Sequence, residues 1–155
     1  MTLESAYAGA RALLLEYMAA PLAQRPALVT KLRPQHADFA RVFEPDHAVA
    51  AAERGYVQLW GNAPVWPAPP DSTLEVFCAP AADAFPDTFP GGYAEIACWL
   101  KKGVIWTCWQ IGLPGRAGGT LIDGLAEVEP GRWAWFPRPW KVLPKPLGPT
   151  LYWDE

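Results

Sequence analysis

The chain has 155 residues, of which 51% are hydrophobic and 19% are charged, and its formal net charge is −3. This length suits one domain with a substantial core. The lack of a basic excess argues against a dedicated nucleic-acid-binding protein, and charges that interrupt every long apolar run argue against a membrane protein.

The N-terminus and the cysteines indicate a cytoplasmic protein. Glu4 and Arg11 interrupt the first apolar stretch, and no basic segment precedes it, so a secretory signal is not expected. The chain has three cysteines, Cys78, Cys98 and Cys108. An odd number without a Cys-x-x-Cys pair favours free, buried thiols over a disulfide framework or a zinc site. We expect no metal and no cofactor.

Residues 1–60 carry apolar side chains at helical spacing and hold only four of the 18 prolines. A first helix ends at Pro21, because proline cannot continue a helix. Pro26 and Pro34 each suit the first turn of another helix. The apolar face of the first helix is predicted to contain Leu3, Tyr7, Ala10, Leu14 and Met18.

Two further apolar faces follow in this part. The first contains Phe39, Val42 and Phe43, and its helix stops before Pro45. The second is the clearest amphipathic pattern in the chain and is followed by Gly61, which favours a helix C-terminus. The members of this second face are Val49, Ala52, Tyr56, Leu59 and Trp60.

The composition changes after residue 60, where 14 of the 18 prolines, 11 of the 13 glycines and eight of the nine tryptophans lie. Residues 61–71 contain four prolines and predict a connection across the surface. Helical spacing predicts a short helix over 93–100. Runs rich in β-formers predict four strands, at 72–78, 104–111, 120–128 and 132–136.

Helices first and antiparallel strands later predict an α+β fold. We expect three or four N-terminal helices packed on one face of a C-terminal, mostly antiparallel four-stranded sheet that could be curved. The alternation of side chains along a strand puts Trp106 and Trp109 on opposite faces, and Trp133 and Trp135 together on a core face.

A single domain over residues 1–155 is expected, because neither half alone is large enough to bury its aromatic side chains. It would comprise a helical part, a proline-rich connection, a β-rich part and a tail. These parts are predicted at 1–60, 61–71, 72–143 and 144–155.

Two short strings, Asp123-Gly124-Leu125 and Gly131-Arg132-Trp133, stand in the predicted sheet. Together with helices followed by a curved antiparallel sheet, they resemble the cone-shaped NTF2-like (cystatin-like) α+β group over residues 91–141. Residues 136–140, Phe-Pro-Arg-Pro-Trp, are similar to strings at the end of small bacterial proteins. The NTF2-like resemblance implies a fold that often forms a pocket between sheet and helices, and that hosts enzymes, ligand binders and structural subunits.

The sequence carries no catalytic signature such as a nucleophile elbow, a zinc-protease motif or a phosphate-binding loop. Asp123 is the most informative polar residue, because it interrupts an apolar strand and an ionised carboxylate in a core needs partners. It either lines a polar spot in a pocket, paired with Arg132 or Arg138, or it points to solvent or lies at a bulge with Gly124.

Residues 132–145 interleave four basic side chains with three tryptophans and contain no acidic residue. Such a segment could stack on a nucleic-acid strand and neutralise it. Arginine stacked on tryptophan within the fold explains the same pattern equally well, and the rest of the protein is acidic. Nucleic acid is therefore not the expected partner.

Our leading hypothesis is a non-enzymatic binding protein for a small ligand or a protein partner, such as a bacterial toxin-neutralising (immunity-type) protein. The alternative is an NTF2-like enzyme in which Asp123 acts as a base or an orienting group in a tryptophan-lined pocket. In both cases the expected binding wall consists of Trp106 or Trp109 with Asp123 and Arg138.

The two classes of binding protein differ in what they expose. A deep pocket that reaches Asp123 would favour a ligand binder or an enzyme, whereas a flat exposed aromatic patch would favour a protein partner. The oligomeric state stays open, with a homodimer among the options.

Overall fold

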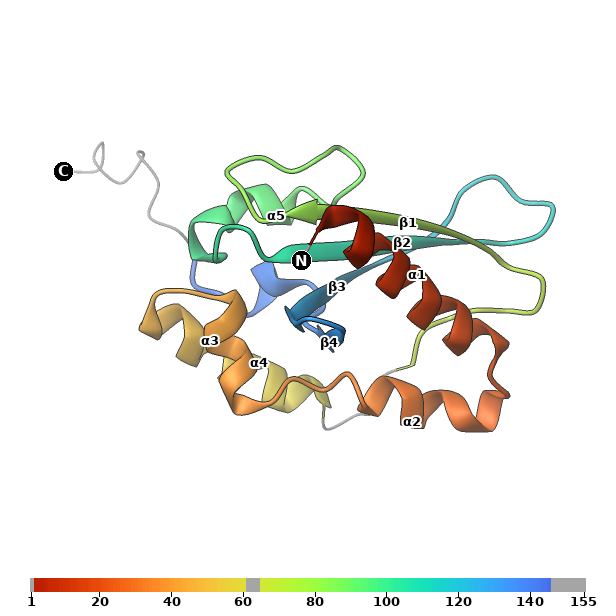
Figure 1. The fold of residues 1–155 in the computed structure, drawn as a ribbon, viewed down its shortest axis with the longest axis horizontal. Coiled ribbons are helices and arrows are strands. Elements are labelled where there is room, and N and C mark those ends of the chain that lie inside the picture. The colour runs from red at the N-terminus through yellow and green to blue at the C-terminus, as the bar shows by residue number, and fades with distance from the viewer. Residues whose placement is uncertain (1, 61–64, 146–155) are drawn as a thin grey trace.

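The computed structural model describes residues 2–60 and 65–145 (Figure 1). Four helices come first: α1 (Leu3–Ala19), α2 (Arg25–Thr30), α3 (His36–Val42) and α4 (Asp46–Trp60). The strands are β1 (Thr73–Pro80), β2 (Ile105–Gly112), β3 (Gly119–Glu129) and β4 (Arg132–Trp135), with the short helix α5 (Gly92–Glu95) between β1 and β2. Three 3-10 turns complete the order: η1 (Leu22–Gln24), η2 (Ala97–Trp99) and η3 (Pro139–Lys141). The predicted α+β class, with helices first and strands later, is confirmed.

The four strands form one antiparallel sheet in the order β1-β2-β3-β4, so each strand pairs with the next one along the chain. All four predicted strands form, with shifts of one or two residues at their ends. The helix predicted over 93–100 forms as two shorter pieces, α5 and η2.

Both faces of the sheet are covered, and the expectation that the helices pack on one face is wrong. Trp106 is fully buried against Phe43, which follows α3, and against Tyr93 of α5. On the opposite face Trp109 is 1% exposed and packs on Trp66, on the side where α1 lies along β1 and β2. The sheet is therefore the middle layer of the molecule (Figure 1).

The buried face of α1 agrees with the predicted one at Ala10 and Leu14 but not at Leu3 and Tyr7. Leu3 and Tyr7 are 47% and 43% exposed, whereas Ala6 and Ala10 are fully buried. Gly9 lies directly against the indole of Trp133. Small side chains let the helix approach the sheet closely, so the larger apolar residues one position away are turned outward. On α4 the predicted face is largely confirmed, with Ala52, Tyr56 and Trp60 buried.

The proline-rich connection crosses the surface as predicted over the described residues 65–71, but it sends the side chains of Trp66 and Ala68 into the core. Trp66 is 4% exposed, and the Tyr17 hydroxyl donates a hydrogen bond of 2.8 Å to its carbonyl. The guanidinium of Arg25 donates to the Ala68 carbonyl at 2.8 Å. These contacts hold an extended segment that has few backbone partners of its own.

Other sequence expectations can be checked directly. Trp133 and Trp135 are both 6% exposed, as predicted for a core face. The three cysteines are free, but only Cys108 is buried; Cys98 is exposed, so the prediction of three buried thiols is wrong for this residue. In the described ranges, no helix combines the length and the apolar character that crossing a membrane requires.

Candidate functional site

A β-bulge in β3 sets the direction of Asp123. Trp109 pairs with Ile122 and Thr107 pairs with Leu125, so Asp123 and Gly124 together face one residue of β2. Gly124 has a φ of 101°, and a Cβ there would overlap the backbone of Phe136. Only glycine fits this position. The bulge that was one of the sequence-based alternatives is therefore present.

The bulge does not expose Asp123, which is only 6% exposed. Its Oδ2 accepts a hydrogen bond of 2.6 Å from the Tyr93 hydroxyl and one of 3.0 Å from the backbone N–H of Arg138. Its carbonyl accepts from the Trp135 indole at 2.7 Å. Within residues 2–60 and 65–145, no other residue donates a hydrogen bond to the second carboxylate oxygen, Oδ1.

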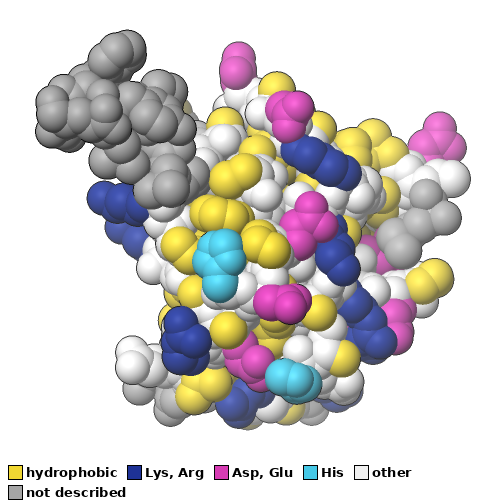
Figure 2. Space-filling model, turned by 90° about the vertical axis from the view of Figure 1, so that its left-hand side faces the viewer, with side chains coloured by type: hydrophobic (Ala, Val, Ile, Leu, Met, Phe, Trp, Pro, Cys, Tyr) yellow, Lys and Arg dark blue, Asp and Glu magenta, His cyan; other side chains and the backbone are white. Residues whose placement is uncertain are grey.

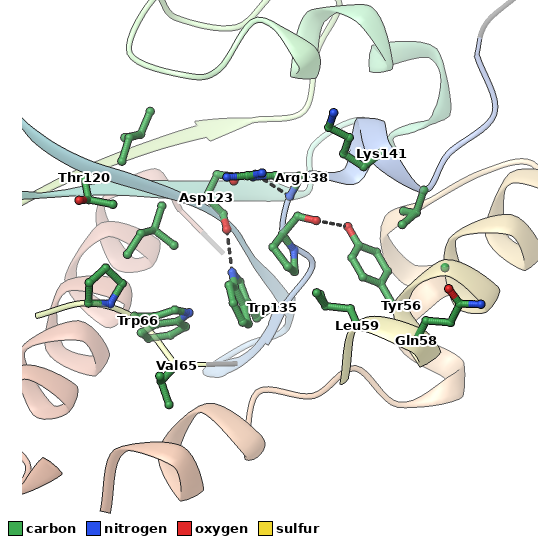
Figure 3. A pocket seen from close by; sticks show the side chains of 16 residues that line it. Tyr56, Gln58, Leu59, Val65, Trp66, Thr120, Asp123, Trp135, Arg138 and Lys141 are labelled. Atoms are coloured by element: carbon green, nitrogen blue, oxygen red, sulfur yellow. Dashed lines mark hydrogen bonds between the residues drawn. The ribbon is translucent and has the colours of Figure 1, made fainter. Parts of the chain in front are cut away.

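Asp123 lines a cavity of about 630 Å³ (Figure 3). The walls come from α4, the segment 65–67, β3, β4 and the turn after β4, and most lining side chains are apolar. Trp66 and Trp135 form an edge-to-face pair with ring centroids 5.3 Å apart. In Figure 3 the two indoles lie side by side below Asp123, with Leu59 and Tyr56 across from them.

The structure brings two of the four predicted wall residues to this cavity. Asp123 and Arg138 both line it. Trp106 and Trp109 do not line it, because both rings are buried in the core, with 0% and 1% of their surface exposed. The tryptophans of the wall are instead Trp66 and Trp135. Trp135 was expected in the core, and Trp66 was hidden in the proline-rich connection.

The segment after β4 brings Arg138 and Lys141 to the cavity. Pro137 accepts a hydrogen bond of 2.8 Å from the Tyr56 hydroxyl on α4. A side chain at Gly92 of α5 would overlap Trp140, whose ring packs on Tyr93 with centroids 5.6 Å apart. This segment is therefore fastened to α4 on one side and to α5 on the other.

Arg138 has left-handed backbone angles, φ 46° and ψ 60°. It stands between Pro137 and Pro139, and a following proline disfavours the right-handed helical region. The left-handed conformation points its N–H at Asp123. The predicted pairing of Asp123 with Arg138 thus occurs through the backbone, and the side chain of Arg132 pairs elsewhere, with Asp38.

Burial dominates the electrostatics around Asp123. It raises the pKa of Asp123, and the hydrogen bonds from Tyr93 and Arg138 offset this only in part. Burial, together with the nearby Asp123 charge, places the pKa of Tyr93 and of Tyr56 well above the usual value of a phenol. The same two causes raise the pKa of Cys108 to about 12. The two hydroxyls and the thiol therefore stay protonated at neutral pH, and Cys108 is no nucleophile.

Metal chemistry finds no support in the described part of the chain, where no three His, Cys, Asp or Glu side chains gather in a way that could hold an ion. The cavity instead combines an apolar aromatic wall with a buried carboxylate and two cationic side chains. Such a lining can bind an organic molecule and fix its orientation.

Comparison of this chain with known proteins finds no match. No protein-family model matches the chain, and no curated protein and no solved structure matches it either. The NTF2-like resemblance therefore stays a prediction.

Proposed function

We propose that this chain is a small-molecule-binding protein, and that its ligand occupies the cavity between Trp66, Trp135 and Asp123. The observation that carries the proposal is a cavity of about 630 Å³ that is lined by a buried aspartate, whose Oδ1 accepts no hydrogen bond from another residue of the described part. Ligand sites are typically concave and mostly apolar, have volumes of roughly 300–1,000 Å³, and contain a few polar groups that fix orientation.

Tryptophan exposure supports a small ligand over a protein partner such as a toxin. Six of the eight tryptophans in the described residues are buried, and Trp99 and Trp140 are half-buried. A protein-binding patch would normally present such side chains on the surface. On the face formed by the left side of Figure 1, acidic and basic side chains are interspersed with small apolar groups (Figure 2).

One observation favours the enzyme alternative, in which Asp123 transfers a proton. Burial raises the pKa of Asp123, and a raised carboxyl pKa in a cavity is a common property of catalytic acids and bases. The nearest titratable neighbours, Tyr93 and Tyr56, have pKa values raised well above the usual one. They hold protons instead of exchanging them, so we place binding first.

The proposal is tested by closing the cavity. Leu59 lines it from α4, whereas Val57, on the same helix, is 58% exposed and lies outside the lining. N-phenyl-1-naphthylamine, a neutral probe that fluoresces in apolar sites, should bind the wild-type protein and Val57→Trp at one saturable site. Leu59→Trp should lose that binding while keeping its melting temperature.

Two results would contradict the proposal. One is the absence of saturable binding of N-phenyl-1-naphthylamine by the wild-type protein. The other is equal binding by all three proteins, which would place the probe outside the cavity. Native mass spectrometry of protein purified from its own host would then show whether any small molecule travels with it.

A further inference from the structure

The charged residues that line the cavity differ in their exposure to solvent. Among the described lining residues, the charged side chains are those of Asp123, Arg138 and Lys141. Asp123 is buried, whereas Arg138 and Lys141 are exposed. Figure 3 shows Asp123 and Arg138 next to each other, with Lys141 on the turn beyond them, so the lining holds one buried carboxylate and, where it meets solvent, two exposed cations. A ligand that fills it meets positive charge where it meets solvent.

Arg138 and Lys141 lack a salt bridge, as most basic residues of the described part do, and what distinguishes them is their place in the lining of the cavity. Arg132 and Arg41 both form salt bridges to Asp38, and Lys102 forms one to Asp83. For Arg138 and Lys141, no acidic partner lies within salt-bridge distance in residues 2–60 and 65–145. Burial raises the pKa of Asp123, and the nearby charge of Arg138 lowers it in part. Neither cation is paired with a carboxylate of the described residues at salt-bridge distance, so both can pair with an anionic ligand.

The backbone at Arg138 gives an independent reason to assign this side chain a role. A non-glycine residue in the left-handed conformation costs roughly 1–2 kcal/mol, and its φ of 46° places Arg138 there. Glycine would make the same backbone hydrogen bond to Asp123 without this cost. Strained residues of this kind concentrate at binding sites, so the guanidinium itself is the feature to explain.

We infer that the ligand is an anionic ring compound. This inference rests on the proposed function, because it names the class of ligand that the same cavity binds. The acidic group of the ligand, a carboxylate, sulfonate or phosphate, pairs with Arg138 and Lys141 where the cavity meets solvent. Its flat apolar part contacts the edge-to-face pair of Trp66 and Trp135, and an N–H or O–H group of the ligand donates to Oδ1 of Asp123.

Two probes separate this inference from the proposed function. 8-Anilinonaphthalene-1-sulfonate and N-phenyl-1-naphthylamine share their rings and their N–H group and differ by one sulfonate. The wild-type protein should bind the sulfonate probe about tenfold more tightly or better, as expected for a charge-assisted hydrogen bond. This preference should shrink as salt is added, because both cations are exposed to solvent.

The variants assign the preference to the two cations. Arg138→Gly removes the guanidinium and keeps the N–H that binds Asp123, and Lys141→Gln removes the ammonium. Each should reduce the preference for the sulfonate probe over the neutral probe severalfold. Arg11→Gln is the matched control, because Arg11 is exposed on α1 and does not line the cavity. It should behave like the wild-type protein.

The outcomes have distinct meanings. Equal affinity of the wild-type protein for both probes overturns the anionic ligand and leaves the binding cavity standing. A preference that survives in Arg138→Gly and in Lys141→Gln also overturns it, because the sulfonate then pairs elsewhere. Failure of both probes to bind overturns the proposed function and the inference together.

Discussion

Asp38 and Asp123 are both buried aspartates, but the protein treats their charges differently. Asp38 is fully buried and accepts hydrogen bonds from the side chains of Arg132 and Arg41 and from the backbone N–H of Gln35. Burial alone would raise the pKa of Asp38, but these donors, with Arg132 the strongest, outweigh it and lower that pKa. Both carboxylate oxygens are satisfied.

The residues that donate hydrogen bonds to Asp123 do so through neutral groups, the Tyr93 hydroxyl and the Arg138 N–H, and both reach the same oxygen. The charge of Arg138 also lowers the pKa of Asp123, but no cation of the described residues forms a salt bridge to it. Its pKa is therefore raised by burial and not restored. The comparison teaches that burial of a charge does not by itself indicate function. A compensated charge such as Asp38 holds the fold together, whereas an incompletely compensated charge facing a cavity is suited to a ligand.

The largest expected effect comes from the glycine that aims Asp123. Gly124→Ala should lower the free energy of unfolding by about 3 kcal/mol, because it combines backbone strain at positive φ with overlap against the backbone of Phe136 and Pro137. Gly103→Ala is the control, since Gly103 has a φ of 87° but no atom near its missing side chain. It should cost about 1 kcal/mol. Chemical denaturation measures both, and equal losses would show that the bulge is not tightly packed.

The next effect separates the two aspartates directly. Asp38→Asn should cost about 2 kcal/mol, below the value for a fully buried pair because Arg132 and Arg41 are partly exposed. Asp123→Asn should change stability by less than about 1 kcal/mol, since its donors are neutral.

Binding should show the reverse order. Asp123→Asn replaces the carboxylate in the lining of the cavity with an amide, which loses one acceptor oxygen, so the affinity for N-phenyl-1-naphthylamine should fall about tenfold. Asp38→Asn should leave that affinity unchanged. A loss of binding in Asp38→Asn without unfolding would break the distinction between a structural and a functional aspartate.

Much of the fold was predictable because the spacing of apolar residues along the sequence indicates which side chains are buried. The four strands and the faces of α3 and α4 follow from the spacing of apolar side chains, and the opposite orientation of Trp106 and Trp109 follows from alternation along β2. The buried face of α1 was not predictable in this way. Ala10 and Leu14 were predicted, but Ala6 carries a weak hydrophobic signal, and only the close approach to the sheet selects it over Leu3 and Tyr7.

The candidate site was predictable in part. Asp123 stood out because it interrupts an apolar strand, and Arg138 because it follows the last strand. The choice of Trp106 or Trp109 for the wall was wrong because alternation shows only that they face opposite ways, not which tryptophans border a void. Trp66 could have been suspected, since a large aromatic side chain in an extended segment has to find cover.

The smallest expected effect is the pH dependence of the two aspartates, and their signs are opposite. Asp123 has a raised pKa in the folded state, so the folded protein takes up this proton first as the pH falls, and stability increases between that pKa and the ordinary value of 3.8. Asp38 has a lowered pKa, so below 3.8 the unfolded chain takes up the proton first and stability is lost.

The melting temperature of each variant relative to the wild-type protein makes the two signs visible. The melting temperature of Asp123→Asn should rise relative to that of the wild-type protein as the pH rises from about 4 to about 7, because the variant lacks the ionisation that destabilises the wild-type protein. The deficit of Asp38→Asn should shrink below about pH 3, where the wild-type protein loses the same carboxylate. Glu129 contributes to the acid limb in both proteins, because its hydrogen bond to Arg132 also lowers its pKa. If the differences in melting temperature changed with pH in the same direction for both variants, the surroundings would shift the pKa of both carboxylates in the same direction. That result would contradict the distinction drawn between Asp38 and Asp123.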